Sequence, residues 1–187
     1  MTWKDNFSKQ ADIYAQYRPP YPKELYHFLE NLVFQKKMAW DCGTGNGQVA
    51  TQLATFFEQV IATDASAAQL AYATPLPNLE YRVATAEESG LASNSVNLIT
   101  VAQALHWFDF GKFYQEVRRV AAEEAIIAAW GYGLLTISTA VDEILRHLYA
   151  EILRTYWDAE RRYLDLAYQT IPFPFATIET PTFVMQV

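Results

Sequence analysis

Uncharged apolar runs alternate along the chain with segments in which apolar residues recur at helical spacing. The runs predict four buried strands, at residues 38–40, 60–63, 96–102 and 125–130. A further strand is predicted at residues 79–83, where apolar and polar residues alternate. Helical patterns lie between these strands. Because strands that alternate with helices are typical of βαβ units, we expect an α/β, doubly wound, mostly parallel sheet with right-handed crossovers.

The segments that flank this core follow other patterns. A polar-aromatic stretch rich in proline precedes a helix, and together they predict an N-terminal cap at residues 1–36. After the core at 37–137, residues 138–169 carry an apolar helical stripe, which predicts a helical lid over the carboxyl edge of the sheet. Residues 170–187 end in an alternating stretch, Thr182 to Val187, that predicts a sixth strand. We interpret the whole chain as one domain.

Composition narrows the classes of function. The 187 residues carry a net charge of −7, and an acidic surface repels phosphate groups, so we expect no nucleic-acid partner. The single cysteine, Cys42, excludes an internal disulfide and suits a reducing cytoplasm. No run approaches the ~18 apolar residues of a membrane span, and the first residues lack the apolar region of a signal peptide. The histidines are scattered, which predicts no metal site. We therefore expect a cytoplasmic monomer or homodimer without a membrane partner.

A glycine-rich turn directly follows the first predicted strand and opens a helix. It contains Gly43, Gly45 and Gly47. Glycine adopts positive φ in a tight turn, and its lack of a side chain lets a ligand approach the backbone. The next strand ends at Asp64, so this carboxylate and Asp41 lie at the carboxyl edge of neighbouring strands, where open α/β sheets bind ligands. Asp64 can there accept hydrogen bonds from a ribose diol.

Two cofactors compete for this turn. A dinucleotide fingerprint, G-x-G-x-x-G, needs glycine at position 48, where the chain has Gln48. The spacing G-x-G-x-G resembles motif I of methyltransferases that use S-adenosylmethionine, and Asp41 before it suits the ammonium group of that cofactor. An NAD-dependent oxidoreductase is therefore the less favoured alternative, and a turn with only a structural role is the third.

Further segments resemble the family of class I S-adenosylmethionine-dependent methyltransferases that includes the methyltransferase type 11 domain and trans-aconitate methyltransferase-like proteins. They are Phe7–Pro22, Asp41–Gly47, Asp64, Thr85–Glu87, Gln103–Asp109 and Trp130–Tyr132. The resemblance implies a Rossmann-like fold and S-adenosylmethionine as the cofactor. The implied cofactor contacts are Tyr14, Arg18, Asp41, Gly43, Gly45, Gly47, Asp64, Ala65, Ala86, Glu87, Gln103 and Trp107. Members often have aspartate at the place of Thr85, and they usually end with a sixth and a seventh strand, so we expect C-terminal strands to be missing from this chain.

The resemblance also guides expectations about the methyl acceptor, which we expect to be a small molecule. His106 follows the fourth strand and is a candidate general base for a hydroxyl or amine acceptor. A carboxylate acceptor, which the family includes, needs no base because it is already ionised. Arg161 and Arg162 in the predicted lid are candidates to bind such an anion, with a solvated helix face as the alternative. A protein that binds the cofactor without catalysis is the alternative function.

Overall fold

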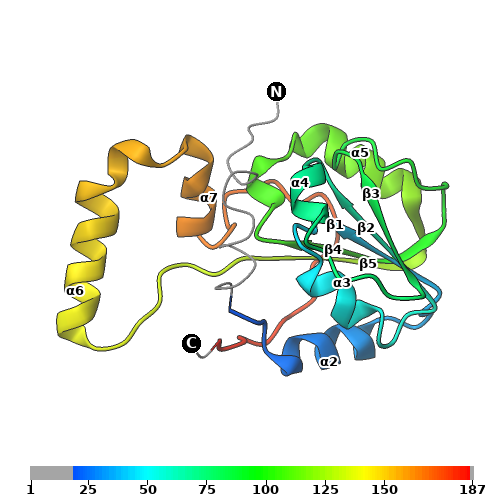
Figure 1. Cartoon of the computed structure of the whole chain (residues 1–187), viewed down its shortest axis with the longest axis horizontal. Helices are drawn as coiled ribbons and strands as arrows, with labels where there is room; N and C mark the ends of the chain where they lie inside the picture. The colour runs from blue at the N-terminus through cyan, green and yellow to red at the C-terminus, as the bar shows by residue number, and fades with distance from the viewer. Residues whose placement is uncertain (1–18, 186–187) are drawn as a thin grey trace.

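The computed structural model describes residues 19–185, and their central feature is a five-stranded parallel sheet (Figure 1). Its strands are β1 (Met38–Cys42), β2 (Gln59–Asp64), β3 (Leu79–Val83), β4 (Val96–Ala102) and β5 (Ala121–Trp130). The order across the sheet is β3-β2-β1-β4-β5, and neighbouring strands are parallel throughout. The predicted α/β doubly wound fold is confirmed, and the direction of winding reverses between β1 and β4.

Helices connect the strands, and local sequence determines where they begin and end. They are α2 (Lys23–Leu32), α3 (Gln48–Leu53), α4 (Ala67–Leu70), the 3-10 turn η2 (Leu105–Trp107) and α5 (Phe110–Val120). The side chains of Asp109 and Ser66 cap α5 and α4 by accepting a backbone N–H of the first turn. α3 ends at Leu53, where the chain turns and buries Phe57. None of the helices between residues 19 and 185 has the length and apolar character needed to cross a bilayer.

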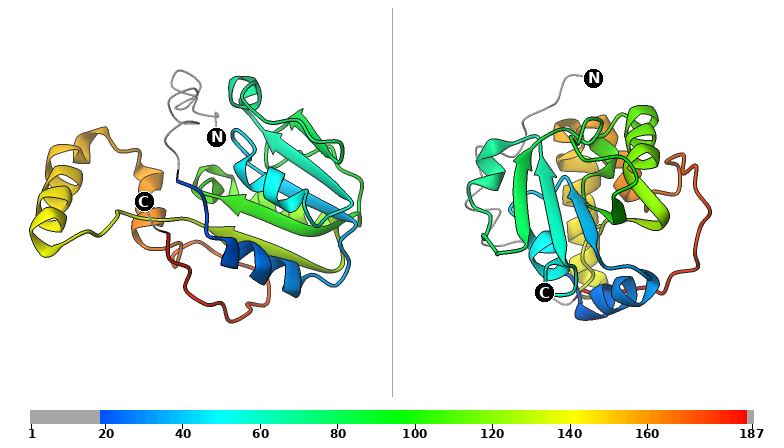
Figure 2. Two further views of the ribbon diagram at one scale, coloured as in Figure 1. Left: turned by 60° about the horizontal axis from the view of Figure 1, so that its bottom comes forward. Right: turned by 90° about the vertical axis from the view of Figure 1, so that its right-hand side faces the viewer.

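The strands divide their side chains between two apolar layers. Ala39 and Val60 belong to the layer that includes α2 and α3, whereas Trp40 and Ile61 belong to the layer that includes α5. Figure 2 shows α2 and α5 on opposite sides of the sheet. A sheet covered on both faces needs apolar residues at nearly every strand position, which explains the uncharged runs of the sequence.

The insertion predicted at 138–169 is helical but is not one continuous helix. It consists of α6 (Thr139–His147), the π-helix η3 (Leu148–Ile152), the 3-10 turns η4 (Arg154–Tyr156) and η5 (Ala159–Arg161), and α7 (Arg162–Asp165). The chain reverses at Trp157, whose indole Nε1 donates to the carbonyl of Tyr149 at 3.0 Å. This contact between turns overrides the helical periodicity, which a linear pattern does not reveal.

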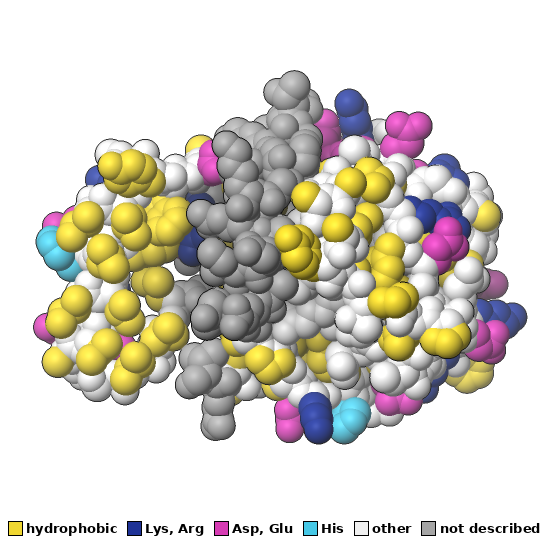
Figure 3. All heavy atoms as spheres, in the orientation of Figure 1, with side chains coloured by type: hydrophobic (Ala, Val, Ile, Leu, Met, Phe, Trp, Pro, Cys, Tyr) yellow, Lys and Arg dark blue, Asp and Glu magenta, His cyan; other side chains and the backbone are white. Residues whose placement is uncertain are grey.

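These elements form an arm beside the core, and the carboxyl ends of the strands point toward it (Figure 1). No residue of α6 is buried, so its apolar stripe is not packed against the sheet. Much of the visible surface of the arm is accordingly hydrophobic (Figure 3). The insertion lies at the predicted edge of the sheet, and its action as a lid stays a prediction.

The sixth strand predicted at Thr182–Val187 is not formed in the described part of the chain. Residues 176–185 have no regular secondary structure, and residues 186–187 lie outside the described residues. No strand in the range 19–185 pairs with the free edge of β5, so the alternating residues have no ladder to join. Phe183 instead packs against Phe28 of α2, with ring centroids 5.7 Å apart. Within residues 182–185 the alternating side chains thus accompany packing on a helix, and a strand that includes residues 186–187 stays a prediction.

Candidate cofactor site

The carboxyl ends of β1 and β4 lie side by side where the winding of the sheet reverses. Asp41 of β1 is in register with Thr100 of β4. The backbone N–H of Gly43 donates to the carbonyl of Thr63 in β2 at 2.9 Å, which binds the glycine turn to the same edge. Open parallel sheets bind ligands in the crevice outside this edge, and this edge carries the residues of the candidate site.

The glycine turn requires glycine for two separate reasons. The φ angles of Gly43, Gly45 and Gly47 are 69°, 58° and 84°, a left-handed conformation that other residues rarely adopt. Space is also limited at Gly43 and Gly47. A Cβ atom at Gly43 would lie 2.6 Å from the Cβ of Ala104, and one at Gly47 would overlap the phenol of Tyr81. The motif is therefore a tightly packed turn and not only a flexible one.

Asp64 links the glycine turn to the end of β2. Its Oδ2 accepts the backbone N–H of Gly45 at 2.8 Å, and its Oδ1 accepts that of Ser66 at 2.9 Å. Burial raises the pKa of the Asp64 carboxyl, and the N–H groups of Ser66 and Gly45 oppose this effect because they stabilise the anion. An ionised carboxylate has about four acceptor positions. Two positions therefore remain for hydroxyl groups of a ligand.

Asp41 is the buried acid of the site, with 1% of its surface exposed. The hydroxyl of Thr44 donates to its Oδ2 at 2.5 Å, and the hydroxyl of Thr100 donates to its Oδ1 at 2.7 Å. A small hollow beside this carboxylate is lined by Asp41, Gly43, Thr44, Gln48, Val49 and Ala102. The negative charge of the Asp41 carboxylate suits a cationic group in this hollow.

Two side-chain carbonyl oxygens, one in the glycine turn and one at the start of α3, lack hydrogen-bond donors among the described residues. Asn46 Oδ1 and Gln48 Oε1 are buried, and nothing within residues 19–185 donates to them. The amide nitrogen of Gln48 donates to the carbonyl of Pro19 at 3.0 Å, which orients this side chain. Native proteins rarely leave buried acceptors unpaired. The two oxygens therefore suit a ligand with hydroxyl or ammonium donors.

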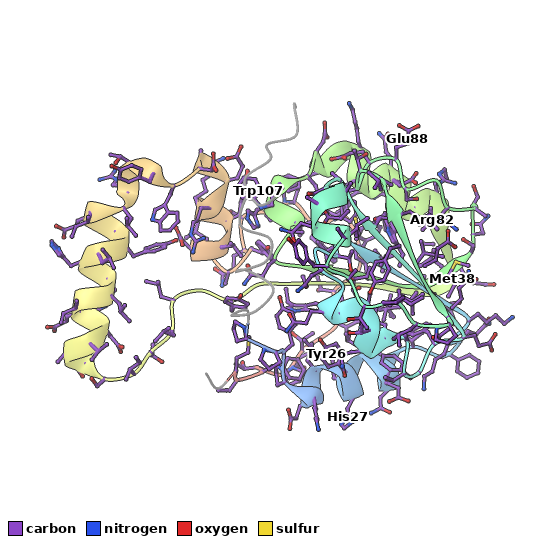
Figure 4. All side chains as sticks on the ribbon, in the orientation of Figure 1. Tyr26, His27, Met38, Arg82, Glu88 and Trp107 are labelled. Carbon is purple, nitrogen blue, oxygen red and sulfur yellow. The ribbon has the colours of Figure 1, made fainter. Side chains whose placement is uncertain are left out.

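The turn after β4 lies at the same edge of the sheet. Gln103 has a φ of 60°, unusual for a residue other than glycine, and its Nε2 donates to the carbonyl of Tyr132 at 3.1 Å. This bond joins the chain segments that follow β4 and β5. Glu87 accepts the backbone N–H of Asp109 at 2.8 Å, which fastens the segment after β3 to the start of α5. Trp107 lies on the side of the core that faces the arm (Figure 4).

His106 lies at the boundary between the core and the arm. Its side chain is 4% exposed, and its Nδ1 is 3.0 Å from the hydroxyl oxygen of Tyr168. Burial lowers the pKa of His106 to about 4, with a contribution from the positive charge of Arg161, while Glu160 acts in the opposite direction. A group with so low a pKa accepts protons poorly at neutral pH. The surroundings of His106 thus give no support to the general base predicted from the sequence.

The two arginines predicted to bind an anion have different surroundings. The guanidinium of Arg161 lies 4.4 Å from the ring centroid of Trp157 and 5.1 Å from that of Tyr149, and its Nε donates to the Tyr149 hydroxyl at 2.5 Å. Its Nη1 and Nη2 form no hydrogen bond with the described residues. Arg162 is exposed and stacks on the tyrosine that follows it. Of these two arginines, Arg161 is the one whose charge lowers the pKa of His106.

Of the other residues predicted to contact the cofactor, some lie near the carboxyl edge of the sheet and two lie outside the described residues. Ala65 follows Asp64 at the carboxyl edge, and Ala86 is buried in the segment after β3. Tyr14 and Arg18 lie outside the described residues. The predicted cofactor residues within the described range therefore lie at the carboxyl ends of β1 and β2, on the segments that follow β1, β2 and β3, or on the turn after β4.

Several residues of the site were missed by sequence reasoning. They are Thr44, Asn46, Tyr81, Thr100 and Tyr168. The first two lie inside the glycine motif, so the motif itself was a sufficient signal for them. Thr100 and Tyr168 are 59 and 62 residues away from the side chains that they contact, and nothing in the linear pattern indicates those contacts.

This arrangement is similar to that of known proteins. Residues 40–129 match the family model described as "Methyltransferase domain". A Dictyostelium discoideum protein named "Putative methyltransferase" is 39% identical over 171 residues, which cover 89% of this chain and 65% of that protein. The Mycobacterium tuberculosis "Uncharacterized methyltransferase Rv3342" is 34% identical over 116 residues, which cover 62% of this chain and 47% of the relative.

A solved structure shows the same fold. The "Putative Type II Methyltransferase" from Anaeromyxobacter dehalogenans superposes with a TM-score of 0.82 at 41% identity, over 90% of this chain and 72% of that one. The doubly wound sheet, the glycine turn and the acid that ends β2 define a class I methyltransferase domain. The chain belongs to the S-adenosylmethionine-dependent methyltransferases, whose cofactor is S-adenosylmethionine. It spans less than two thirds of the length of the two curated relatives named above. Similarity to the trans-aconitate methyltransferases stays a prediction.

Proposed function

We propose that this protein transfers a methyl group from S-adenosylmethionine to a small molecule, and that the acceptor is a carboxylate. The observation that carries the first part is the set of acceptors around the glycine turn. Asp64 has two free acceptor positions, and the oxygens of Asn46 and Gln48 are buried without donors from the described residues. S-adenosylmethionine carries ribose hydroxyls and an ammonium group, so the residues present fit this cofactor.

Each residue is assigned to one part of the cofactor according to its position along the edge of the sheet. Asp64 is assigned to the ribose hydroxyls, and Asp41 to the ammonium group, directly or through water. Ala86 and Glu87 are assigned to the adenine, and Gln103 to the methionine part. The remaining proposed contacts are Tyr14, Arg18, Gly43, Gly45, Gly47, Ala65 and Trp107.

Bound S-adenosylmethionine supplies a methyl carbon whose bond to sulfur breaks, with its electron pair returning to sulfur, as a carboxylate oxygen attacks; a methyl ester and S-adenosylhomocysteine result. No proton has to move in this reaction. The residues of the chain then need only hold the acceptor in line and exclude water. Alignment of this kind contributes about 7–11 kcal/mol to lowering the barrier.

Two features of the boundary between the core and the arm support a carboxylate acceptor. The rings of Tyr149 and Trp157 hold the guanidinium of Arg161, while its Nη1 and Nη2 stay unpaired within the described range. A guanidinium with two free nitrogen atoms can bind a carboxylate through both oxygens. The low pKa of His106 disfavours acceptors that must lose a proton first.

Ligand-dependent melting tests the cofactor part of the proposal. A ligand at about 100 times its dissociation constant stabilises the folded state by about 2.7 kcal/mol. S-adenosylhomocysteine is expected to raise the melting temperature, and NADH, the matched control, is expected to leave it unchanged. The reverse result would indicate an oxidoreductase and refute the proposal.

Transfer of labelled methyl groups tests the acceptor. The panel pairs small carboxylic acids with their primary amides, which have similar shape and no charge. We expect label in the acids and none in the amides. Transfer confined to alcohols or amines would overturn the carboxylate assignment. Binding of S-adenosylhomocysteine without transfer to any acceptor would instead favour a non-catalytic cofactor-binding protein.

A further inference from the structure

Tyr168 joins the end of the arm to the segment after β4. Its hydroxyl oxygen lies 3.0 Å from Nδ1 of His106, and the two ring centroids are 6.0 Å apart. His106 belongs to η2, directly after β4, and Tyr168 follows α7. The contact is therefore one of the points at which the arm and the core meet beside the proposed acceptor site.

The balance of donors and acceptors decides the direction of this hydrogen bond. Within residues 19–185, the Tyr168 hydroxyl has no other acceptor, and His106 forms no other hydrogen bond. If the phenol donates to Nδ1, the imidazole proton lies on Nε2, and only Nε2–H remains unpaired. If Nδ1–H donates to the phenol oxygen, both the phenol hydrogen and Nε2 remain unpaired. Because an unpaired buried polar group is costly, the first arrangement is favoured.

The protonation states of the pair agree with this direction. Burial and the positive charge of Arg161 together lower the pKa of His106 to about 4, although Glu160 acts in the opposite direction. Burial raises the pKa of Tyr168, and the nearby Tyr21 adds to the increase. Both side chains are thus uncharged at neutral pH. The phenol keeps its proton as a donor, and the imidazole keeps one nitrogen free to accept it.

The backbone around Tyr168 is arranged to make this contact. Ala167 and Tyr168 have φ angles of 48° and 61°, a left-handed conformation that is costly for both residue types. The chain is held there because the Tyr168 N–H donates to the carbonyl of Tyr163 at 2.7 Å and its own carbonyl accepts the N–H of buried Ile171 at 3.0 Å. Gly131 leaves space for α7 just before this segment, since a Cβ atom at 131 would lie 2.5 Å from Cδ2 of Leu164.

We propose that Tyr168 is a positioning residue that fixes His106 as a neutral hydrogen-bond donor, with its proton on Nε2, for the methyl acceptor. This inference rests on the proposed function for its chemical meaning. A carboxylate has two oxygens, so one can accept Nε2–H while the other attacks the methyl carbon. An alcohol acceptor would need His106 as a base with a free Nε2, which this tautomer excludes.

Nitrogen NMR of the protein labelled with ¹⁵N-histidine tests the tautomer directly. His27 and His147 are exposed and serve as internal references, and His106→Asn identifies the remaining signals. At neutral pH we expect a protonated Nε2 and an unprotonated Nδ1 in His106. Tyr168→Phe is expected to give a mixture of tautomers and to raise the pKa of His106 toward its usual value of about 6.5.

The matched control is Tyr163→Phe, which removes a phenol of the same arm that does not contact His106. It is expected to leave the His106 signals unchanged. Protonation of Nδ1 in the unaltered protein would overturn the proposal, whether or not Tyr168→Phe folds. An unchanged tautomer in a folded Tyr168→Phe variant would overturn it as well.

Kinetics distinguish this proposal from the proposed function. Tyr168→Phe is expected to lower kcat/KM for a carboxylate acceptor about fivefold, as loss of one neutral hydrogen bond implies, and to leave the affinity for S-adenosylhomocysteine unchanged. An equal loss of cofactor affinity would show a general structural role and refute the positioning role. Absence of transfer in the unaltered protein would refute the proposed function, while the tautomer would still be decided by NMR.

Discussion

Replacement of Gly47 by alanine separates the two reasons for which the turn needs glycine. A left-handed backbone conformation destabilises the folded state by about 1–2 kcal/mol for a residue other than glycine. Alanine also reduces the conformational entropy of the unfolded chain, which stabilises the folded state by about 0.4–1 kcal/mol. These conformational terms alone predict a loss of about 1 kcal/mol. The new Cβ would in addition overlap the Tyr81 phenol, including ring atoms 2.8 and 2.9 Å away. Overpacking of this kind costs about 1–3 kcal/mol.

Gly90 provides the matched control for the conformational terms. Its φ is 69°, and nothing lies within 4 Å of a Cβ atom built there. Gly90→Ala should therefore lose only about 1 kcal/mol. Gly133→Ala, with open space and no left-handed φ, should change stability by less than about 0.5 kcal/mol. Urea unfolding of the three variants measures these differences.

The steric contribution can be tested by its removal. In a Tyr81→Ala background, Gly47→Ala should cost no more than Gly90→Ala, because the overlapping phenol is gone. Calorimetry with S-adenosylhomocysteine should show that Gly47→Ala also weakens binding, whereas Gly90→Ala does not. Equal losses of stability for Gly47→Ala and Gly90→Ala in the unaltered background would contradict a steric contribution from Tyr81.

Other substitutions test Asp64 and Arg161 in the site and the buried hydrogen bonds of Glu116 outside it. The asparagine of Asp64→Asn has a single carbonyl oxygen and cannot accept both backbone N–H groups. Calorimetry should therefore show an affinity for S-adenosylhomocysteine that is at least about tenfold weaker. Unchanged affinity would remove Asp64 from the site. Arg161→Lys should raise KM for carboxylates about tenfold or more while Arg162→Lys does not, and equal kinetics would show that Arg161 binds no substrate. Hydrogen bonds from Arg119 and Ser89 lower the pKa of Glu116 to about 2, below its usual value. The anion therefore stabilises the fold above pH ~4.5, and this stability is lost as the pH falls toward ~2. Melting curves of Glu116→Gln should be flatter over that range, and an identical pH dependence would contradict the assignment of this stability to Glu116.

The parts of the fold that the sequence predicted are those set by local constraints. Trp40 and Ile61 lie in strands buried on both faces, and such strands consist of uncharged runs that can be recognised directly. The glycine turn was predictable because positive φ and close packing require glycine itself. Asp64 was predictable because a parallel sheet brings the ends of its strands to one edge.

The parts that were missed depend on contacts between distant segments. Thr100 bonds Asp41 because the strands that carry them are neighbours in the sheet, a fact that no linear pattern contains. The break in the arm follows from the packing of Trp157 on Tyr149, which outweighs helical periodicity. Phe183 alternates with its neighbours as in a strand, but within the described residues it packs on a helix because no strand is available for pairing.

Residues other than glycine with a left-handed backbone conformation lie at contacts between segments that are distant in the sequence. Gln103 bonds the segment after β5, and Tyr168 bonds His106, so both strained residues join separate segments at the same edge of the sheet. The conformation costs about 1–2 kcal/mol for each residue, whereas one hydrogen bond contributes only about 0.5–1.5 kcal/mol. The hydrogen bonds alone therefore do not offset the strain. Burial of neighbouring apolar residues such as Leu105 and Ile171 must supply the difference, and the hydrogen bonds then determine the orientation of the polar groups.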